Sequence, residues 1–150
     1  MISFTRTDSD NIHFRELVAL LDADLAKRDG DDHSFYAQYN GIGNIRNVIV
    51  CYDDDIAVAC GAFKPYDSEK AEIKRMYVLP DRRGQNLGLS ILKELELWAS
   101  ELNFPECVLE TGKNNPNAIR LYEKAGYSFI KNYGQYENVE TSVCMKKSIL

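Results

Sequence analysis

The stretch AEIKRMYVLPDRRGQNLGLSILKELELWA, residues 71–99, joins an apolar run to an amphipathic run through a basic turn. Residues 71–79 are mostly apolar and stop at Pro80, which predicts a strand. Within 90–103, apolar residues recur three and four positions apart, which predicts a helix with one buried face. The turn between them, 80–88, serves either as a plain connection or as a binding loop, and the rest of the chain decides which.

The turn contains the parts of an anion-binding site. The first N–H groups of a helix have no partner within the helix, and the helix dipole adds positive charge at that end. Helix starts therefore bind phosphate. Gly84 and Gly88 would let a phosphate approach the backbone, and Arg82 and Arg83 would add cationic donors. The same residues also suit an ordinary turn on a solvated surface, and neither the Walker A spacing nor the dinucleotide-binding spacing is present.

The remaining sequence alternates between helical and strand-like periods. Strands are predicted at 47–52, 56–63, 71–79, 107–111, 128–131 and 141–147. Helices are predicted at 10–28 with Asp10 as N-cap, at 33–39, at 90–103, and from Pro116 to Gly126 with Asn115 as N-cap. The resulting order, α, α, β, β, β, α, β, α, β, β, combines hairpins with a β-α-β crossover. It favours a mixed sheet.

Length and composition predict a single domain spanning 1–150. The formal net charge of −5 argues against nucleic acid as the main partner. No signal-peptide pattern opens the sequence and no apolar run reaches the ~18 residues of a membrane span, so we expect a soluble cytoplasmic protein without a membrane partner. The cysteines form no C-x-x-C pair, which gives no zinc or redox signature. Cys60 and Cys107 lie in apolar runs and are expected to be buried and reduced.

Two blocks of the sequence resemble one family. Residues 72–99 resemble the acetyl-CoA-binding core of the GNAT N-acetyltransferases, whose turn follows the pattern [QR]-x-x-G-x-[GA]. Arg83 and Gly88 match its ends, and Asn86 replaces its middle glycine. NNPNAIRLYEKAGY, 114–127, resembles the family's N-x-x-A-I-x-L-Y-E-K-x-G-[FY] block. The resemblance implies an α/β (α+β) GNAT fold, with a central, mixed, mostly antiparallel twisted sheet of six to seven strands and about four helices.

The resemblance also implies an enzyme, an acyltransferase that moves the acetyl group of acetyl-CoA to a primary amine without a metal. The acceptor would be a small amine, an amino acid or a protein amine. Such a reaction needs a base for the amine and an acid for the leaving thiolate. Tyr122 is the expected acid and Glu110 the expected base, with Glu72 or a bound water as alternatives. Structural explanations remain for each: a core tyrosine, a strand-end glutamate and an ion pair.

The same resemblance assigns the cofactor site to the strand before the turn, the turn and the following helices. The expected cofactor-binding residues are Met76, Tyr77, Val78, Arg83, Gly84, Gln85, Asn86, Leu87, Gly88, Asn115 and Tyr122. Asn86 at the middle-glycine position keeps a second interpretation open, a non-catalytic acyl-CoA-binding or regulatory module. A third interpretation keeps the site but changes the acyl group.

The acceptor groove is expected between two loops, 28–39 and 132–140. Acidic and aromatic side chains in the first loop would attract a cationic amine, although a solvated acidic loop explains them equally well. Asp31, Asp32 and His33 are too few for a metal-site prediction. The resemblance also makes a homodimer through the late strands an option. The expected groove residues are Asp29, Asp31, Asp32, Tyr36, Tyr133, Gln135 and Tyr136.

Overall fold

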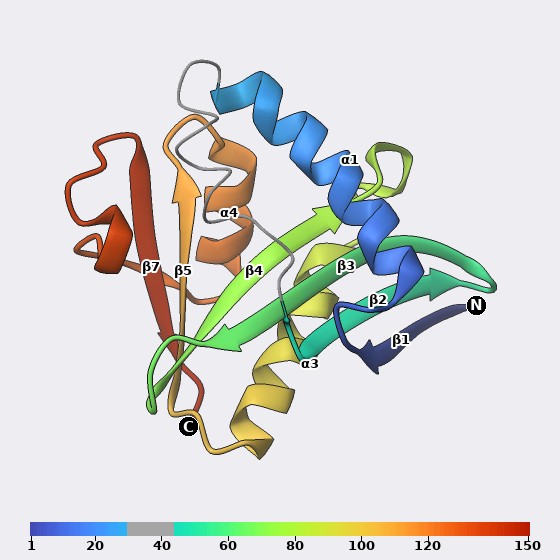
Figure 1. The fold of residues 1–150 in the computed structure, drawn as a ribbon, viewed down its shortest axis with the longest axis horizontal. Helices are drawn as coiled ribbons and strands as arrows, with labels where there is room; N and C mark the ends of the chain where they lie inside the picture. Colours follow the sequence, from blue (N-terminus) through green and yellow to red (C-terminus); the bar gives the residue numbers. More distant parts are fainter. Residues whose placement is uncertain (30–43) are drawn as a thin grey trace.

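A computed structural model describes residues 1–29 and 44–150 of the chain (Figure 1). Its seven strands form one sheet in the order β1-β2-β3-β4-β5-β7-β6. Neighbouring strands run antiparallel, except that β4 and β5 run parallel. The strands are β1 Ile2–Thr7, β2 Asn47–Asp53, β3 Ile56–Pro65, β4 Lys70–Val78, β5 Glu106–Gly112, β6 Ser128–Ile130 and β7 Ser142–Ser148. This arrangement confirms the expected mixed, mostly antiparallel sheet.

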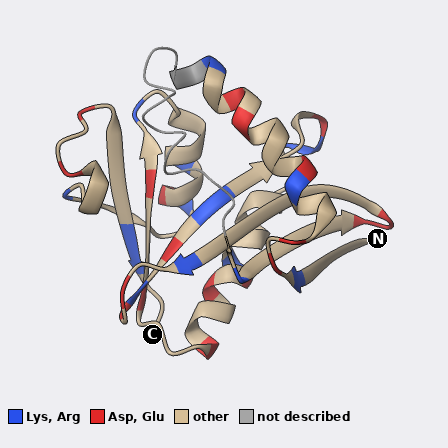
Figure 2. Cartoon of the chain, viewed as in Figure 1, with Lys and Arg blue, Asp and Glu red and all other residues tan. Residues whose placement is uncertain are grey.

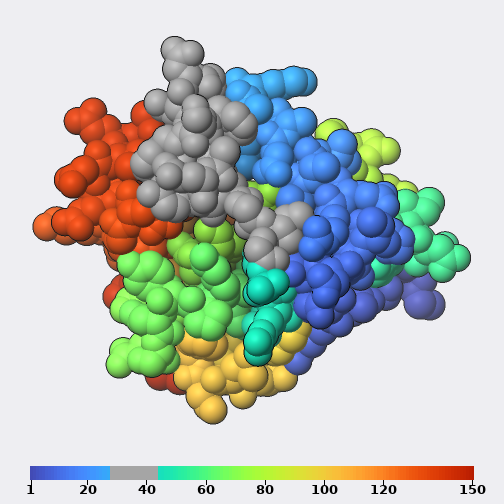
Figure 3. Space-filling model, in the orientation of Figure 1, coloured from blue at the N-terminus to red at the C-terminus, as the bar shows by residue number. Residues whose placement is uncertain are grey.

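Helices cover both faces of this sheet. Helix α1 (Ile12–Asp29) crosses one face, and α3 (Leu87–Glu101) and α4 (Pro116–Lys124) lie against the other (Figure 1). Each face has its own apolar cluster, one built around α1 with β2 and β3, the other around α3 with β3, β4 and β5. Figure 3 shows α1 and the segment between β6 and β7 on the same face of the molecule, although they are far apart in the sequence. The predicted helix at 33–39 lies outside the described residues.

Helix α4 begins and ends as its sequence predicts, whereas α3 begins earlier than predicted. Asn115 caps α4, because its side-chain oxygen accepts a hydrogen bond from the Ala118 N–H, and Pro116 takes the first helical position. Gly126, at φ 102°, ends the helix in the left-handed conformation. Helix α3 starts at Leu87, three residues earlier than the apolar period predicts, so its first turn belongs to the glycine-bearing segment.

Two predictions near the N-terminus were wrong. The N-cap of α1 is Asn11 rather than Asp10, because the Asn11 side chain accepts the Phe14 N–H at 3.0 Å. The sequence prediction also missed β1, which pairs with β2 at the sheet edge. This strand is largely exposed and lacks the apolar run that marks the buried strands. An edge strand needs only one partner, so its sequence carries a weaker signal.

Strand β4 leaves its neighbour β5 part-way along its length. The two strands pair only from Lys70 and Glu106 to Glu72 and Val108. Beyond that point β4 continues to pair with β3 on its other side, so one edge of its backbone faces a gap. Such a gap between diverging strands can admit an extended ligand.

A bulge interrupts β4 opposite Gly61. The register shifts so that two residues, Arg75 and Met76, oppose this one glycine of β3. Arg75 has φ 59°, in the left-handed region. Because a bulge bends and twists the strand, it turns the end of β4 away from β5.

All four cysteines, Cys51, Cys60, Cys107 and Cys144, are buried free thiols, as expected for Cys60 and Cys107. Burial raises the pKa of Cys60 and of Cys107 to about 12 in each case, so these thiols are unreactive near neutral pH. Among the described residues, no helix is long and apolar enough to cross a membrane.

Candidate active site

The glycine-bearing turn presents the start of α3 with unused backbone donors. Asn86 is the N-cap residue, with φ 61° and ψ 21°, and its side chain makes no capping hydrogen bond. Gly84 is also left-handed, at φ 84°. Asparagine is one of the few residues that adopt this conformation readily, so Asn86 keeps the backbone path that a glycine would give. The N–H groups of the first helical turn stay available for an anion.

A cavity of about 340 Å³ opens between the end of β4, this turn and α4. It brings most of the predicted cofactor residues together. Those that line it are Met76, Tyr77, Val78, Arg83, Gly84, Asn86, Leu87, Gly88, Asn115 and Tyr122. Gln85 is exposed in the same turn and does not belong to the described wall. Gly88 lies where α3 meets α4, since a Cβ atom added there would approach Leu121 Cδ2 to 3.3 Å.

The two arginines of the turn have partners within the protein. Both arginines line the larger cavity. Arg82 forms an ion pair with Asp53 at 2.5 Å, and Arg83 lies 3.7 Å from Asp24. Arg83 also contacts two residues at the end of β4. Its Nε donates to the Val78 carbonyl oxygen at 3.0 Å, and its guanidinium lies 5.6 Å from the centre of the Tyr77 ring. The Val78 carbonyl therefore faces the gap, on the side away from β3.

A second, smaller cavity of about 140 Å³ adjoins the first. It lies where β4 and β5 diverge. Leu21 and Leu25 of α1, Tyr122 of α4 and Tyr136 complete its wall. Both cavities share Leu21, Met76, Asn115, Ala118 and Tyr122 in their walls. A molecule that spans the two cavities must therefore pass Tyr122.

Tyr122 is almost fully buried in α4, with 7% of its surface exposed. Its hydroxyl makes no hydrogen bond within the described part of the chain. Burial, and to a lesser degree the charge of Glu110, raises the pKa of the Tyr122 phenol. The hydroxyl therefore stays protonated at neutral pH and is available as a donor.

The two candidate carboxylates line the smaller cavity but differ in their surroundings. Glu110 is half-buried on β5 and accepts a hydrogen bond of 2.7 Å from the Ser142 hydroxyl. Glu72 is almost completely buried on β4, accepts a hydrogen bond of 2.7 Å from the Tyr133 hydroxyl and lies 3.8 Å from the Lys74 ammonium. Both carboxylates thus line the smaller cavity and have partners, but Glu72 is almost completely buried, whereas Glu110 is only half-buried.

One of the predicted groove residues at the C-terminal end lines this cavity. Tyr136 is in its wall, and Tyr133 stacks edge-on against Tyr136 and Tyr66. Gln135 is half-buried in a short 3-10 helix, Gly134–Tyr136, and is not among the described residues of the cavity wall. On the other side, Asp31, Asp32 and Tyr36 lie outside the described residues, as does the side chain of Asp29.

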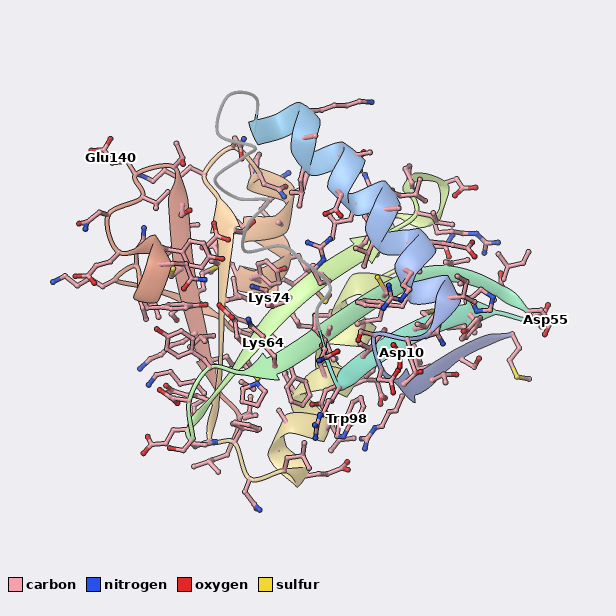
Figure 4. The ribbon with its side chains drawn as sticks, viewed as in Figure 1. Asp10, Asp55, Lys64, Lys74, Trp98 and Glu140 are labelled. Carbon is pink, nitrogen blue, oxygen red and sulfur yellow. The ribbon has the colours of Figure 1, made fainter. Side chains whose placement is uncertain are left out.

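Sequence reasoning missed two basic residues of the smaller cavity, Lys74 and Arg75. Figure 4 shows Lys74 on β4 where this strand parts from β5. Burial lowers the pKa of Lys74, although the nearby Glu72 charge opposes that shift. The signal was present in the sequence, because two adjacent cations inside a predicted buried strand are unusual. Within the described residues, no group of three or more histidine, cysteine, aspartate or glutamate side chains is placed to hold a metal.

The Acetyltransferase (GNAT) family matches residues 13–127, which is most of the chain. This range contains the described lining residues of the larger cavity and those of the smaller one except Tyr136. The chain belongs to the GNAT acetyltransferase family. An uncharacterized N-acetyltransferase of Schizosaccharomyces pombe is 33% identical over 78 residues, 51% of this chain and 48% of that protein. An IAA acetyltransferase of Azospirillum brasilense is 34% identical over 94 residues, 61% of each chain. This GNAT chain thus spans about half to three-fifths of the length of these relatives.

Solved structures share the whole fold of this GNAT protein. An acyl-CoA N-acyltransferase of Klebsiella pneumoniae, so named in its description, superposes with a TM-score of 0.83, at 29% identity and with 100% and 99% of the two chains covered. The Salmonella typhimurium acetyltransferase yncA, solved with acetyl-CoA, gives a TM-score of 0.70 at 15% identity, with 99% and 94% covered. The latter likeness concerns the fold alone.

Proposed function

We propose that this GNAT protein transfers the acetyl group of acetyl-CoA to a primary amine. The observation that carries the proposal is the meeting of two cavities at Tyr122, one beside a helix start with free N–H groups and one beside two carboxylates. The larger cavity suits a phosphate-bearing, extended cofactor, and the smaller one suits a cationic acceptor. Family membership supports the same reaction.

The cofactor would lie along the free edge of β4 with its diphosphate at the start of α3. Leu79 donates its N–H to Val58 of β3 at 3.0 Å. Since backbone groups alternate along a strand, Met76 and Val78 turn theirs toward the gap, where the amide-bearing arm of coenzyme A would pair with them. Arg83 would then exchange its bond to Val78 for contacts to the cofactor. Gly84 and Asn86 allow the tight turn, and Gly88 leaves room at the helix start.

Glu110 would act as the base and Tyr122 as the acid. An alkyl ammonium group has a pKa of about 10.4, so it must lose a proton before it can attack. Glu110 would accept that proton, directly or through a water, because it is half-buried at the cavity wall and close enough to influence Tyr122. Glu72 is the alternative base. Its ties to Tyr133 and Lys74 make it better suited to holding the cavity wall.

The chemical step balances with these groups and water. Bound acetyl-CoA would supply a thioester, whose carbonyl carbon the neutral amine attacks. The C–N bond forms and the C–S bond breaks while the Tyr122 phenol donates its hydrogen bond to the departing sulfur. The second proton of the amine passes through water to the thiolate, and the proton on Glu110 leaves to solvent, so the products are an acetamide, free coenzyme A and one proton.

Release of free thiol from acetyl-CoA in the presence of an amine panel tests the proposal. We expect thiol release that depends on both substrates and mass spectra that show one added acetyl group on the acceptor. Glu110→Gln should reduce turnover more than Glu72→Gln at unchanged acetyl-CoA affinity, and the reverse order would make Glu72 the base. Tight binding of acetyl-CoA without thiol release across the panel would favour the non-catalytic module instead. Faster turnover with a longer acyl-CoA would favour a different acyl group.

A further inference from the structure

Arg75 is a buried cation with an unused donor. It occupies the bulge of β4, and 2% of its side chain is exposed. Its Nη2 atom donates to Asp22 Oδ1 of α1 at 2.5 Å. Its Nε atom is buried and has no hydrogen-bond partner in the described part of the chain. Buried guanidinium donors are almost always paired, since an unpaired one is unfavourable.

Arg75 itself belongs to the wall of the smaller cavity. Arg75 and its neighbour Lys74 line that cavity together with Glu110. Asp22 is half-exposed, at 49%, so the Nη2 atom of Arg75 has a solvent-facing partner, whereas the Nε donor has none among the described residues. An ion pair that only fastened α1 to β4 would not require a second donor of the same guanidinium to remain unpaired.

Opposite charges face each other across the gap between the two strands. Figure 2 shows a basic segment of β4 and an acidic segment of β5 where the strands part. The basic residues are Lys74 and Arg75, and the acidic residue across the cavity is Glu110. A small molecule with an amine at one end and an anion at the other would match both walls.

Resting on the function proposed above, we propose that the acceptor is an amino acid whose carboxylate binds the Arg75 guanidinium while its amine faces Glu110. A planar guanidinium suits a carboxylate better than any other side chain does. The cavity, of about 140 Å³, is close to the size of a cavity of about 150 Å³ that holds benzene in another protein. Its size therefore fits a single amino acid.

Matched acceptors test the carboxylate site. Each member of a panel of free amino acids is compared with its own carboxamide in the thiol-release assay. The carboxamide lowers the pKa of the neighbouring amine toward the ~8 of a peptide α-amino group, so intrinsic reactivity favours the amide. We expect the opposite order, a kcat/KM about 10- to 100-fold higher for the best amino acid than for its amide, as charge-assisted hydrogen bonds imply.

Arg75→Met provides the second measurement, because methionine keeps an unbranched, flexible apolar stem and removes the guanidinium group. Asp22 is half-exposed and would not be left as a buried unpaired charge. In this variant the KM of the amino acid should rise about 10- to 100-fold while that of the amide stays within threefold. Arg6→Met, which removes an arginine paired with Glu101 on the protein surface, is the control and should change neither KM.

The outcomes separate the two proposals. If wild-type protein acetylates amides or simple amines as well as amino acids, the carboxylate site is refuted and the acetyltransfer proposal stands. A preference for amino acids that Arg75→Met retains, with the variant folded by thermal melt, would also remove Arg75 from the site. If no amine yields thiol although acetyl-CoA binds, both proposals fail. Should the variant not fold, the preference of the wild-type protein for acid over amide decides the matter alone.

Discussion

Replacing Tyr122 with phenylalanine removes one oxygen atom from the point where the two cavities meet. The ring stays, so the packing of Tyr122 against Tyr127, with centroids 5.9 Å apart, should persist. The hydroxyl has no hydrogen-bond partner within the described residues, so the free energy of unfolding should change by less than about 1 kcal/mol. A loss of activity in this variant would therefore report on chemistry.

The size of that loss follows from the surroundings of the phenol. General acids contribute about 10²- to 10⁴-fold to a rate. Burial and Glu110 raise the pKa of Tyr122 above the ~10 of a free phenol, whereas the leaving thiol has a pKa of ~8.5. Complete proton transfer to the thiolate would be uphill, so the phenol acts mainly by donating a hydrogen bond to the developing charge. We expect the low end of the range, a kcat about 100-fold lower, equivalent to about 2.7 kcal/mol.

The assay is thiol release at saturating acetyl-CoA, with the cofactor affinity measured separately by calorimetry. Tyr127→Phe is the matched control, because Tyr127 is equally buried but donates its hydroxyl to Glu96 at 3.0 Å. That variant should lose about 1–3 kcal/mol of stability and keep its kcat. Tyr122→Phe should keep its stability and lose its kcat. A kcat for Tyr122→Phe within threefold of wild type would refute the acid role.

Three further changes test the rest of the site. Gly88→Glu puts a bulky anion where the diphosphate should bind. It is expected to weaken acetyl-CoA binding, measured by calorimetry, at least about 100-fold. The control Leu97→Glu, on the exposed side of α3, should leave the affinity intact. Asn86→Val should lower the free energy of unfolding in urea by about 1–2 kcal/mol, because valine rarely adopts the left-handed backbone conformation. Asn86→Gly should leave it nearly unchanged. Equal losses in the two variants would contradict this explanation. Burial raises the pKa of Tyr133 in the folded state, so above pH ~10 the unfolded chain ionises first and stability falls by up to about 1.36 kcal/mol per pH unit for this residue. Tyr133→Phe should make that alkaline decline less steep in urea melts from about pH 9 to 11, and an identical slope would show that Tyr133 does not contribute.

The sequence sufficed for elements whose signals are local. The period of α3 and the capping residues of α4, Asn115 and Gly126, act within a few residues of the elements that they define. The strand β1 and the N-cap of α1 were mispredicted for the same kind of reason. β1 is held by its pairing with β2 rather than by its own composition, and Asp10 and Asn11 differ too little as capping residues for sequence alone to choose between them.

Most of the residues that line the larger cavity could be predicted together, because one contiguous stretch, the end of β4 and the following turn, contributes many of them. The smaller cavity could not be predicted, because it depends on where two strands separate. Nothing in the local sequence around Lys74 and Arg75 indicates that β4 separates from β5 after Glu72. Without that departure, both cations would lie inside a closed sheet and would require a different explanation. Only the assembled sheet shows that they face a cavity opposite Glu110.

The bulge at Arg75 connects the two halves of the site. In an uninterrupted strand, Ile73 on the α3 face would put residues 75 and 77 on that face too. Instead, Met76 and Val78 pack with the α3 cluster, and Tyr77 packs with the α1 cluster. One inserted residue thus exchanges the faces of the sheet toward which the later side chains of β4 point. It turns the backbone of Met76 and Val78 toward the gap between β4 and β5 and places Arg75 in the wall of the smaller cavity.

The partner strand accommodates this insertion at a single position, Gly61. A Cβ atom there would lie 2.5 Å from Met76 Sδ and 2.7 Å from Ile91 Cγ2, closer than packed atoms can approach. The missing side chain of Gly61 therefore provides the space for Met76, and the position of Met76 fixes the bulge. Cofactor alignment and acceptor selection would then depend on the same local distortion of β4, so a change that relaxes the bulge should disturb both together.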